Sequence, residues 1–89
     1  QQKMETRVAI MSIIVEDGGK IEEINRLLHE TNEYIIGRMG IPYRQKGISI
    51  ISIAIDAPQD TISTLSGKIG RLSGVTTKTA YSNVITKTE

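Results

Sequence analysis

The sequence predicts one small α+β domain of the ferredoxin-like class, in which two helices lie on one face of a four-stranded antiparallel sheet. Its 89 residues suffice for one domain and no more. Segments with strand patterns and segments with helical periodicity follow one another in the order β-α-β-β-α-β. With right-handed crossovers, this order places the first and third strands in the middle of the sheet.

The first predicted strand covers residues 5–15 and is apolar on both alternating sets of positions. A strand with two apolar faces is typical of a position that is covered on both sides. One set runs from Val8 to Ile14 through Ile10, and the other contains Ala9, Met11, Ile13 and Val15.

The first predicted helix covers roughly residues 19–31. Asp17 is a plausible N-cap, and the apolar residues from Ile21 to Leu28 recur at helical spacing. The carboxylates of this helix include Glu22, four residues before Arg26, a spacing typical of a solvated face and not of a catalytic pair.

A hairpin is predicted next, from a second strand over residues 34–43 and a third strand over residues 48–55. Ile35, Met39 and Ile41 are expected to share one face of the second strand. Pro42 cannot donate a hydrogen bond to a neighbouring strand, so this strand is expected at an edge of the sheet.

The second predicted helix begins after residues 56–60, where either Asp56 or Asp60 could be the cap. Its apolar stripe runs from Ile62 to Leu72, and Gly74 follows its end. The last strand, from residue 75 to about 85, is rich in threonine, as expected of an exposed edge strand.

Two helices cover only one face of such a sheet, so the other face needs a partner. We therefore expect a homo-oligomer, at least a dimer. Its predicted contact residues are Met11 and Ile13 of the first strand, with Gly67 and Gly70 of the second helix. Each interior glycine costs a helix roughly 1 kcal/mol, which close approach by another chain or simple fraying would explain.

The best candidate for a small-ligand site is the loop before the first helix. Asp17, Gly18 and Gly19 precede a helix N-terminus, whose free N–H groups can receive a carboxylate or phosphate. We expect an anionic effector there, reached by Arg38. A plain strand-to-helix turn would have the same sequence.

Composition excludes several other functions. The chain has no cysteine and one histidine, so we expect no metal site and no cofactor. A net charge of +1 argues against direct DNA binding. No apolar run is long enough for a membrane helix and no signal peptide opens the sequence, which favours a cytoplasmic protein. The domain is expected to cover residues 4–89, with residues 1–3 either added to the natural sequence or disordered.

The sequence resembles a family of short proteins described as regulators of iron-only hydrogenase systems. The resemblance covers nearly the whole chain from Met4. It rests mainly on residues 38–42 (RMGIP), 65–70 (LSGKIG) and 73–75 (SGV), with support from residues 15–17 and from helix-one residues that include Asn25 and His29.

This resemblance implies a ferredoxin-like domain similar to ACT domains and to the C-terminal domain of nickel-responsive repressors, and a regulatory, non-enzymatic role. The repressors' nickel site uses several histidines and a cysteine, which this sequence lacks. Two alternatives stay open: an ACT-like amino-acid-binding subunit, and a purely structural assembly partner without a ligand. Acylphosphatases share the fold class, but their phosphate loop carries an arginine where this chain has residues 16–19 (EDGG).

Overall fold

The computed structural model describes residues 4–88 and confirms the predicted fold class and element order. The strands are β1 (Met4–Val15), β2 (Ile35–Tyr43), β3 (Ile48–Ala57) and β4 (Val75–Thr88), and the α-helices are α1 (Ile21–Glu30) and α2 (Gln59–Gly70). Short 3-10 helices occur at η1 (Gly18–Lys20), η2 (Asn32–Tyr34) and η3 (Arg44–Lys46). The prediction for residues 1–3 lies outside the described residues.

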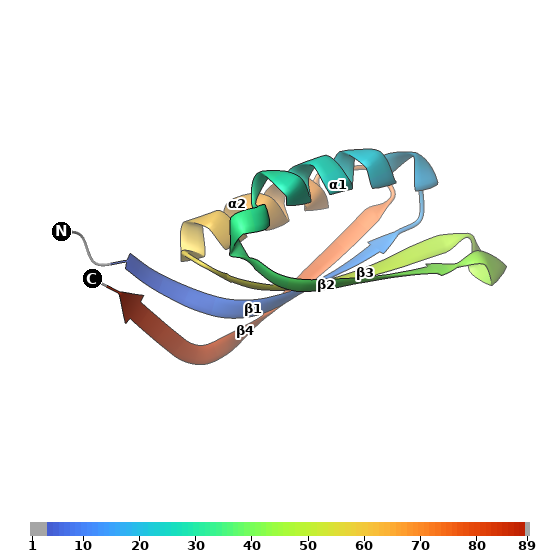
Figure 1. The fold of residues 1–89 in the computed structure, drawn as a ribbon. Helices are drawn as coiled ribbons and strands as arrows, with labels where there is room; N and C mark the ends of the chain where they lie inside the picture. The colour runs from blue at the N-terminus through green and yellow to red at the C-terminus, as the bar shows by residue number, and fades with distance from the viewer. Residues whose placement is uncertain (1–3, 89) are drawn as a thin grey trace.

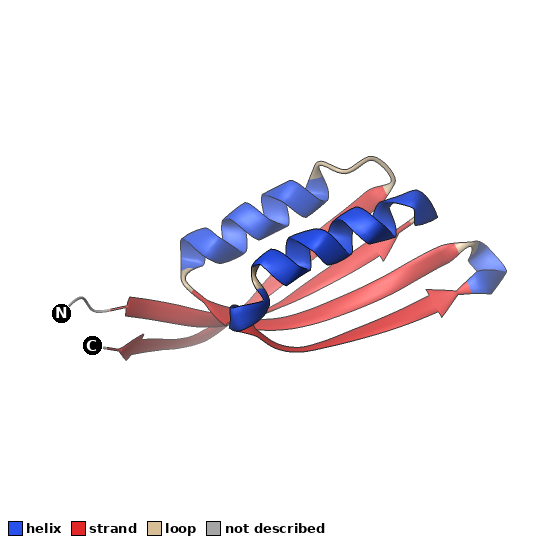
Figure 2. Ribbon diagram, turned by 45° about the horizontal axis from the view of Figure 1, so that its top comes forward, coloured by secondary structure: helices blue, strands red, loops and turns tan. Residues whose placement is uncertain are grey.

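The four strands form one antiparallel sheet in the order β2-β3-β1-β4, and both α-helices lie on the same face of it (Figure 1). β1 and β3 are therefore central, while β2 and β4 are edges, as predicted. Figure 2 shows α1 and α2 side by side above the sheet, with β2 along its free edge.

The core lies between the helices and the sheet and is aliphatic. β1 contributes Ala9, Met11, Ile13 and Val15, all at most 1% exposed, and the predicted stripes of both helices pack on them. Burial of a side chain of this size stabilises the fold by about 1.5–3 kcal/mol, so these contacts are the main support of a small domain.

Two predicted details of the helices and strands are wrong. Neither Asp56 nor Asp60 caps α2: Asp56 belongs to β3, Asp60 lies in the first turn, and the cap position is Pro58, which has no side-chain hydrogen bond to offer. Ile35 does not share a face with Met39, because a register shift between Ile35 and Gly37 turns the strand. Ile35 packs against the core, whereas Met39 is 56% exposed.

Candidate functional site

The sheet face opposite the helices carries a patch of large apolar side chains. Pairing puts the even-numbered residues of β1 and β3 on this face, so that Ile10 lies opposite Ala54 and Ile14 opposite Ile50. β2 adds three more apolar side chains beside β3. We call these exposed residues the open-face patch: Ile10, Ile14, Met39, Ile41, Tyr43 and Ile50, each 37–56% exposed.

The open-face patch is uncharged at its centre. Ser12 and Ser52 are opposite each other between its isoleucines, and the nearest lysine in that row, Lys78, stands on the edge strand β4. Together, the six side chains of the open-face patch expose on the order of 500 Å² of surface. This area is at the upper end of the apolar patches that monomeric proteins leave uncovered. Such a patch is a candidate protein interface.

The predicted interface residues of β1 are on the other side of the sheet. Met11 and Ile13 are 0% exposed and lie in the core beneath the helices, where another chain cannot touch them. Their place on the open face is taken by Ile10 and Ile14. The sequence contained one signal of this: Ser12 interrupts the even-numbered apolar residues of β1, whereas the odd-numbered residues from Ala9 to Val15 are all apolar, as expected of a buried face.

The two predicted contact residues of α2, Gly67 and Gly70, have different settings. A Cβ at Gly70 would lie 3.3 Å from Cγ2 of Thr77 in β4, so this glycine allows the helix to approach its own sheet. At Gly67 the nearest atom is 3.4 Å away and belongs to the flexible side chain of Arg71. Gly70 thus lies beside the chain's own sheet although it is exposed, and Gly67 is half-buried.

The loop before α1 is closed by its own residues. Asp17 is the N-cap of η1, the 3-10 turn that leads into α1, whereas the N-cap of α1 itself is Lys20. The Asp17 Oδ1 accepts a hydrogen bond of 3.0 Å from the Gly19 N–H. The Glu16 N–H donates to the carbonyl of Gly74 at 2.7 Å, and the loop thereby packs on the end of the α2–β4 connection. An anion at this helix start would have to displace the Asp17 carboxylate.

Arg38 lies on the helix side of β2. Its Nη2 donates to Oδ1 of Asn25 in α1 at 2.8 Å, and both residues line a depression of about 240 Å³ together with Ile21 and Gly40. Gly19 lines a different depression, beside Glu22, Glu23 and Arg26. The structure thus gives Arg38 and the Asp17–Gly19 loop separate surroundings.

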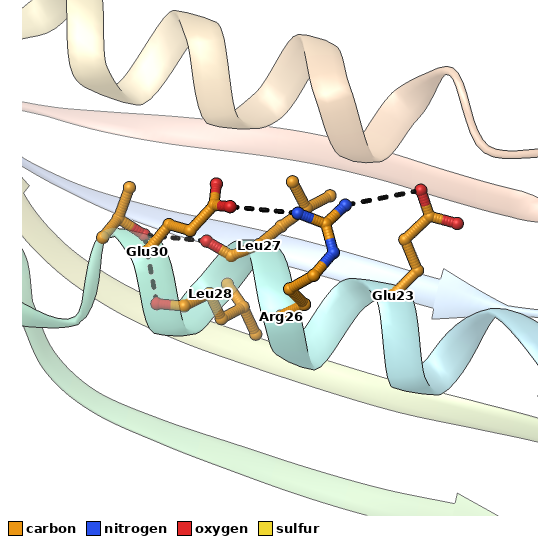
Figure 3. Close-up of polar contacts among 6 residues, drawn as sticks. Glu23, Arg26, Leu27, Leu28 and Glu30 are labelled. Carbon is orange, nitrogen blue, oxygen red and sulfur yellow. Dashed lines mark hydrogen bonds and ion pairs between the residues drawn. The ribbon is translucent and has the colours of Figure 1, made fainter.

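The outward surface of α1 is solvated, as its sequence predicts, but Arg26 pairs with Glu23 and Glu30 and not with the expected Glu22. Arg26 lies between Glu23, at 3.7 Å, and Glu30, at 3.0 Å (Figure 3), and all three side chains are about half exposed. At the helix end, the Thr31 hydroxyl donates to the carbonyls of Leu27 and Leu28. These carboxylates have the structural surroundings of a surface helix.

Within residues 4–88, no group of three His, Cys, Asp or Glu side chains is placed to hold a metal ion. The same stretch of chain contains no helix with the length and hydrophobicity to cross a bilayer.

The fold defines a small ferredoxin-like domain whose sheet has one face that the helices leave uncovered. Residues 7–79 match the family described as "TM1266-like: Iron-only hydrogenase system regulator, putative". The chain belongs to this family, as its resemblance implied.

Solved structures agree with this assignment. The uncharacterized protein TM1266 from Thermotoga maritima superposes with a TM-score of 0.82 at 38% identity, over 85% of this chain and 96% of that one. A nitrogen regulatory PII-like protein, CPII from Thiomonas intermedia K12 in its apo form, has a TM-score of 0.56 at 12% identity, over 99% of this chain and 100% of that one.

A formyltetrahydrofolate deformylase from Pseudomonas putida KT2440 matches over 86% of this chain but only 29% of its own, with a TM-score of 0.65 and 17% identity. At these identities, the deformylase and the PII-like protein show the fold alone. A search of the curated proteins gave no significant match.

Proposed function

We propose that this chain is a non-catalytic regulatory module of an iron-only hydrogenase system and that it acts as a homo-oligomer. The family description supports the system and the regulatory role. The main support for a homo-oligomer is the open-face patch, because a large uncharged apolar surface on a small domain favours association with another chain.

Assembly would give the module a way to transmit a signal. A ligand or partner that binds one oligomeric state better than another shifts the population between the states by its differential affinity. The chain needs no catalytic group for this role, and two carboxylates of α1, those of Glu23 and Glu30, form surface ion pairs with Arg26.

The proposed effector is a small anion. Of the predicted site residues, Arg38 and the Asp17–Gly19 loop line separate depressions, and Arg38 is the proposed contact for this anion. Arg38 is the cationic side chain of the depression beside α1, and its recorded partner is the neutral amide of Asn25. A carboxylate makes a stronger, charge-assisted hydrogen bond with a guanidinium than an amide does, so an anion can compete for Arg38. At the Asp17–Gly19 loop, by contrast, the negative charge of the Asp17 carboxylate repels an anionic ligand.

Deletion of the gene in its native host tests the regulatory role. We expect changed expression or maturation of the hydrogenase, restored by the wild-type gene and not by Ile14→Lys, which puts a charge into the open-face patch. Hydrogenase transcript, protein and activity levels equal to those of the parent strain would contradict the proposal.

Thermal shift measurements with phosphate and with each free amino acid test the effector. A ligand that binds only the folded chain raises the melting temperature as its concentration rises. Loss of that shift in Arg38→Gln would support the proposed site. A shift with one amino acid alone would favour the ACT-like alternative, and no shift with any ligand would favour the purely structural one.

A further inference from the structure

Arg7 of β1 is held in place by residues of α2 and β4. Its Nη1 donates a hydrogen bond of 3.3 Å to Oε1 of Gln59, the first residue of α2, and its Cζ lies 5.3 Å from the centroid of the Tyr81 ring in β4. Nε2 of Gln59 in turn donates to the Tyr81 hydroxyl at 3.0 Å and to Oγ of Ser63 at 3.2 Å. The guanidinium group is therefore fixed between the start of α2 and the β4 edge of the sheet.

A β-bulge in β4 helps to put the tyrosine in this place. The pairing of β1 with β4 shifts register between Arg7 and Ala9. Over these two steps of β1, β4 advances four residues, from residue 85 to Tyr81. Such irregularities bend a strand, re-aim its side chains and are frequent next to active sites. The contact between Tyr81 and Arg7 thus lies at an irregular point of an otherwise regular sheet.

The guanidinium of Arg7 has hydrogen-bonding capacity that the protein does not use. An arginine side chain has five N–H donors. In the part of the chain that the structure describes, the bond to Gln59 is the one hydrogen bond recorded for this side chain, and its Nε is buried without a partner. Covered donors of a charged group are costly to leave unpaired, so they indicate a water, an ion or a ligand nearby. Nη2 has no recorded partner either and is not among the covered atoms.

Arg7 borders a depression of about 190 Å³ that Glu5, Thr6 and Gln59 also line. β1 continues here beyond the end of β3: its last pair with β3 is Arg7 with Ala57, whereas its pairs with β4 extend to Met4. Figure 1 shows β1 and β4 running on together past the start of α2. A ligand can therefore approach the guanidinium from the side that β3 leaves open.

We propose that this depression binds a small oxyanion, a phosphate or a carboxylate group, on the guanidinium of Arg7. The planar fork of a guanidinium matches two oxygens of either group and forms charge-assisted hydrogen bonds with them. Because Nε is covered, the two Nη groups are the contacts that the anion reaches. Arg38 lines a different depression, so this site is additional to the proposed effector contact and does not depend on the regulatory role.

The contacts around Arg7 prepare the site for an anion. Arg7 is half-buried, and its contacts with Gln59 and Tyr81 already restrict the side chain. A free surface arginine loses rotamer freedom when it binds a ligand, whereas an arginine already held in place loses less. Partial burial also strengthens the hydrogen bonds to the anion, because less water screens the charges.

Titration of the full chain with inorganic phosphate and, separately, with acetate tests the proposal. Ionic strength is held constant with chloride, and two-dimensional NMR spectra of the isotope-labelled chain follow the Nε–H signal of Arg7 and the side-chain amide signals of Gln59. Both sets of signals should shift saturably with at least one of the two anions. A response to phosphate alone assigns a phosphate site, and a response to acetate alone assigns a carboxylate site.

Variants of the lining residues give the expected changes in affinity. Arg7→Gln should weaken anion binding roughly tenfold or more, measured on the Gln59 signals, because the charge-assisted hydrogen bonds are lost. Arg7→Lys keeps the charge but not the fork, and should weaken binding by a smaller factor. Glu5→Gln removes the negative charge of the depression and should tighten binding. Arg38→Gln is the matched control and should leave the titration of the Arg7 signal unchanged.

The outcomes separate this site from the proposed function. Saturable shifts that Arg7→Lys weakens and Glu5→Gln strengthens support the site, even where Arg7→Gln proves too unstable to titrate. An absence of shifts up to tens of millimolar anion, or shifts that are lost in Arg38→Gln, overturns it and leaves the covered Nε to water. None of these signals reports the mass of the chain in solution or the hydrogenase phenotype, so the proposed function stands or fails independently.

Discussion

Ile14 and Ile50 lie opposite each other on the two central strands, and each exposes more than a third of its surface on the face that the helices leave bare. Their sequence neighbours Ile13 and Ile51 are opposite each other too, but they are buried in the core. One pair of strands therefore carries both the core and the candidate interface.

This alternation predicts opposite effects of lysine at adjacent positions. Ile14→Lys should leave the fold intact and weaken assembly, because its charge stays in water in the single chain and is buried in the oligomer. Ile13→Lys should unfold the domain, since its side chain is 0% exposed. Circular dichroism and light scattering of the two variants check this. Unfolding of both would show that the open face is part of the core.

The glycines of α2 predict a difference in stability. Gly67→Ala should raise the free energy of unfolding by up to about 1 kcal/mol, because only a flexible side chain is nearby. Gly70→Leu should lower it, because a larger side chain would push against Thr77. Urea denaturation measures both. A stable Gly70→Leu variant with lost assembly would instead place this position at an interface.

Asp17 and Gly74 are coupled through a close contact. Gly74 has φ of 73°, and a Cβ there would lie 2.9 Å from the Cβ of Asp17. Gly74→Ala should destabilise the domain by about 1–2 kcal/mol for its left-handed backbone alone, with the steric contact in addition. A double-mutant cycle with Asp17→Gly, which removes the clashing Cβ, should recover the steric part. Strict additivity would show that the contact has no energetic effect.

The chain is also expected to bind transition metals weakly. His29 is its single imidazole, and there is no thiolate, so soft-ligand sites cannot form within one chain. Nickel or zinc at micromolar concentration should leave the melting temperature unchanged, with and without a chelator. Sub-micromolar binding by calorimetry would refute this and would point to a site shared between copies.

Much of the fold could be predicted because its signals are local. Helical spacing from Ile24 to Leu28, the turn before Ile48 and the glycine at residue 74 mark the elements directly. The faces of β1 were harder, because both sets of positions are apolar and only Ser12 marks the open side.

The surroundings of the predicted site residues could not be predicted, because they are made by contacts between residues that lie far apart in the sequence. Gly70 faces Thr77 because α2 lies against β4, and Arg38 reaches Asn25 because β2 passes beside α1. Likewise, the shift that separates Ile35 from Met39 is a property of pairing with β3. Periodicity within one segment contains none of this information.

The mass of the wild-type chain in solution tests the central claim most directly. Light scattering coupled to size exclusion, at micromolar concentration, should give a mass of two or more chains, and Ile14→Lys should shift it toward one. A wild-type mass of a single chain would contradict the account, because the open-face patch would then be left exposed to water.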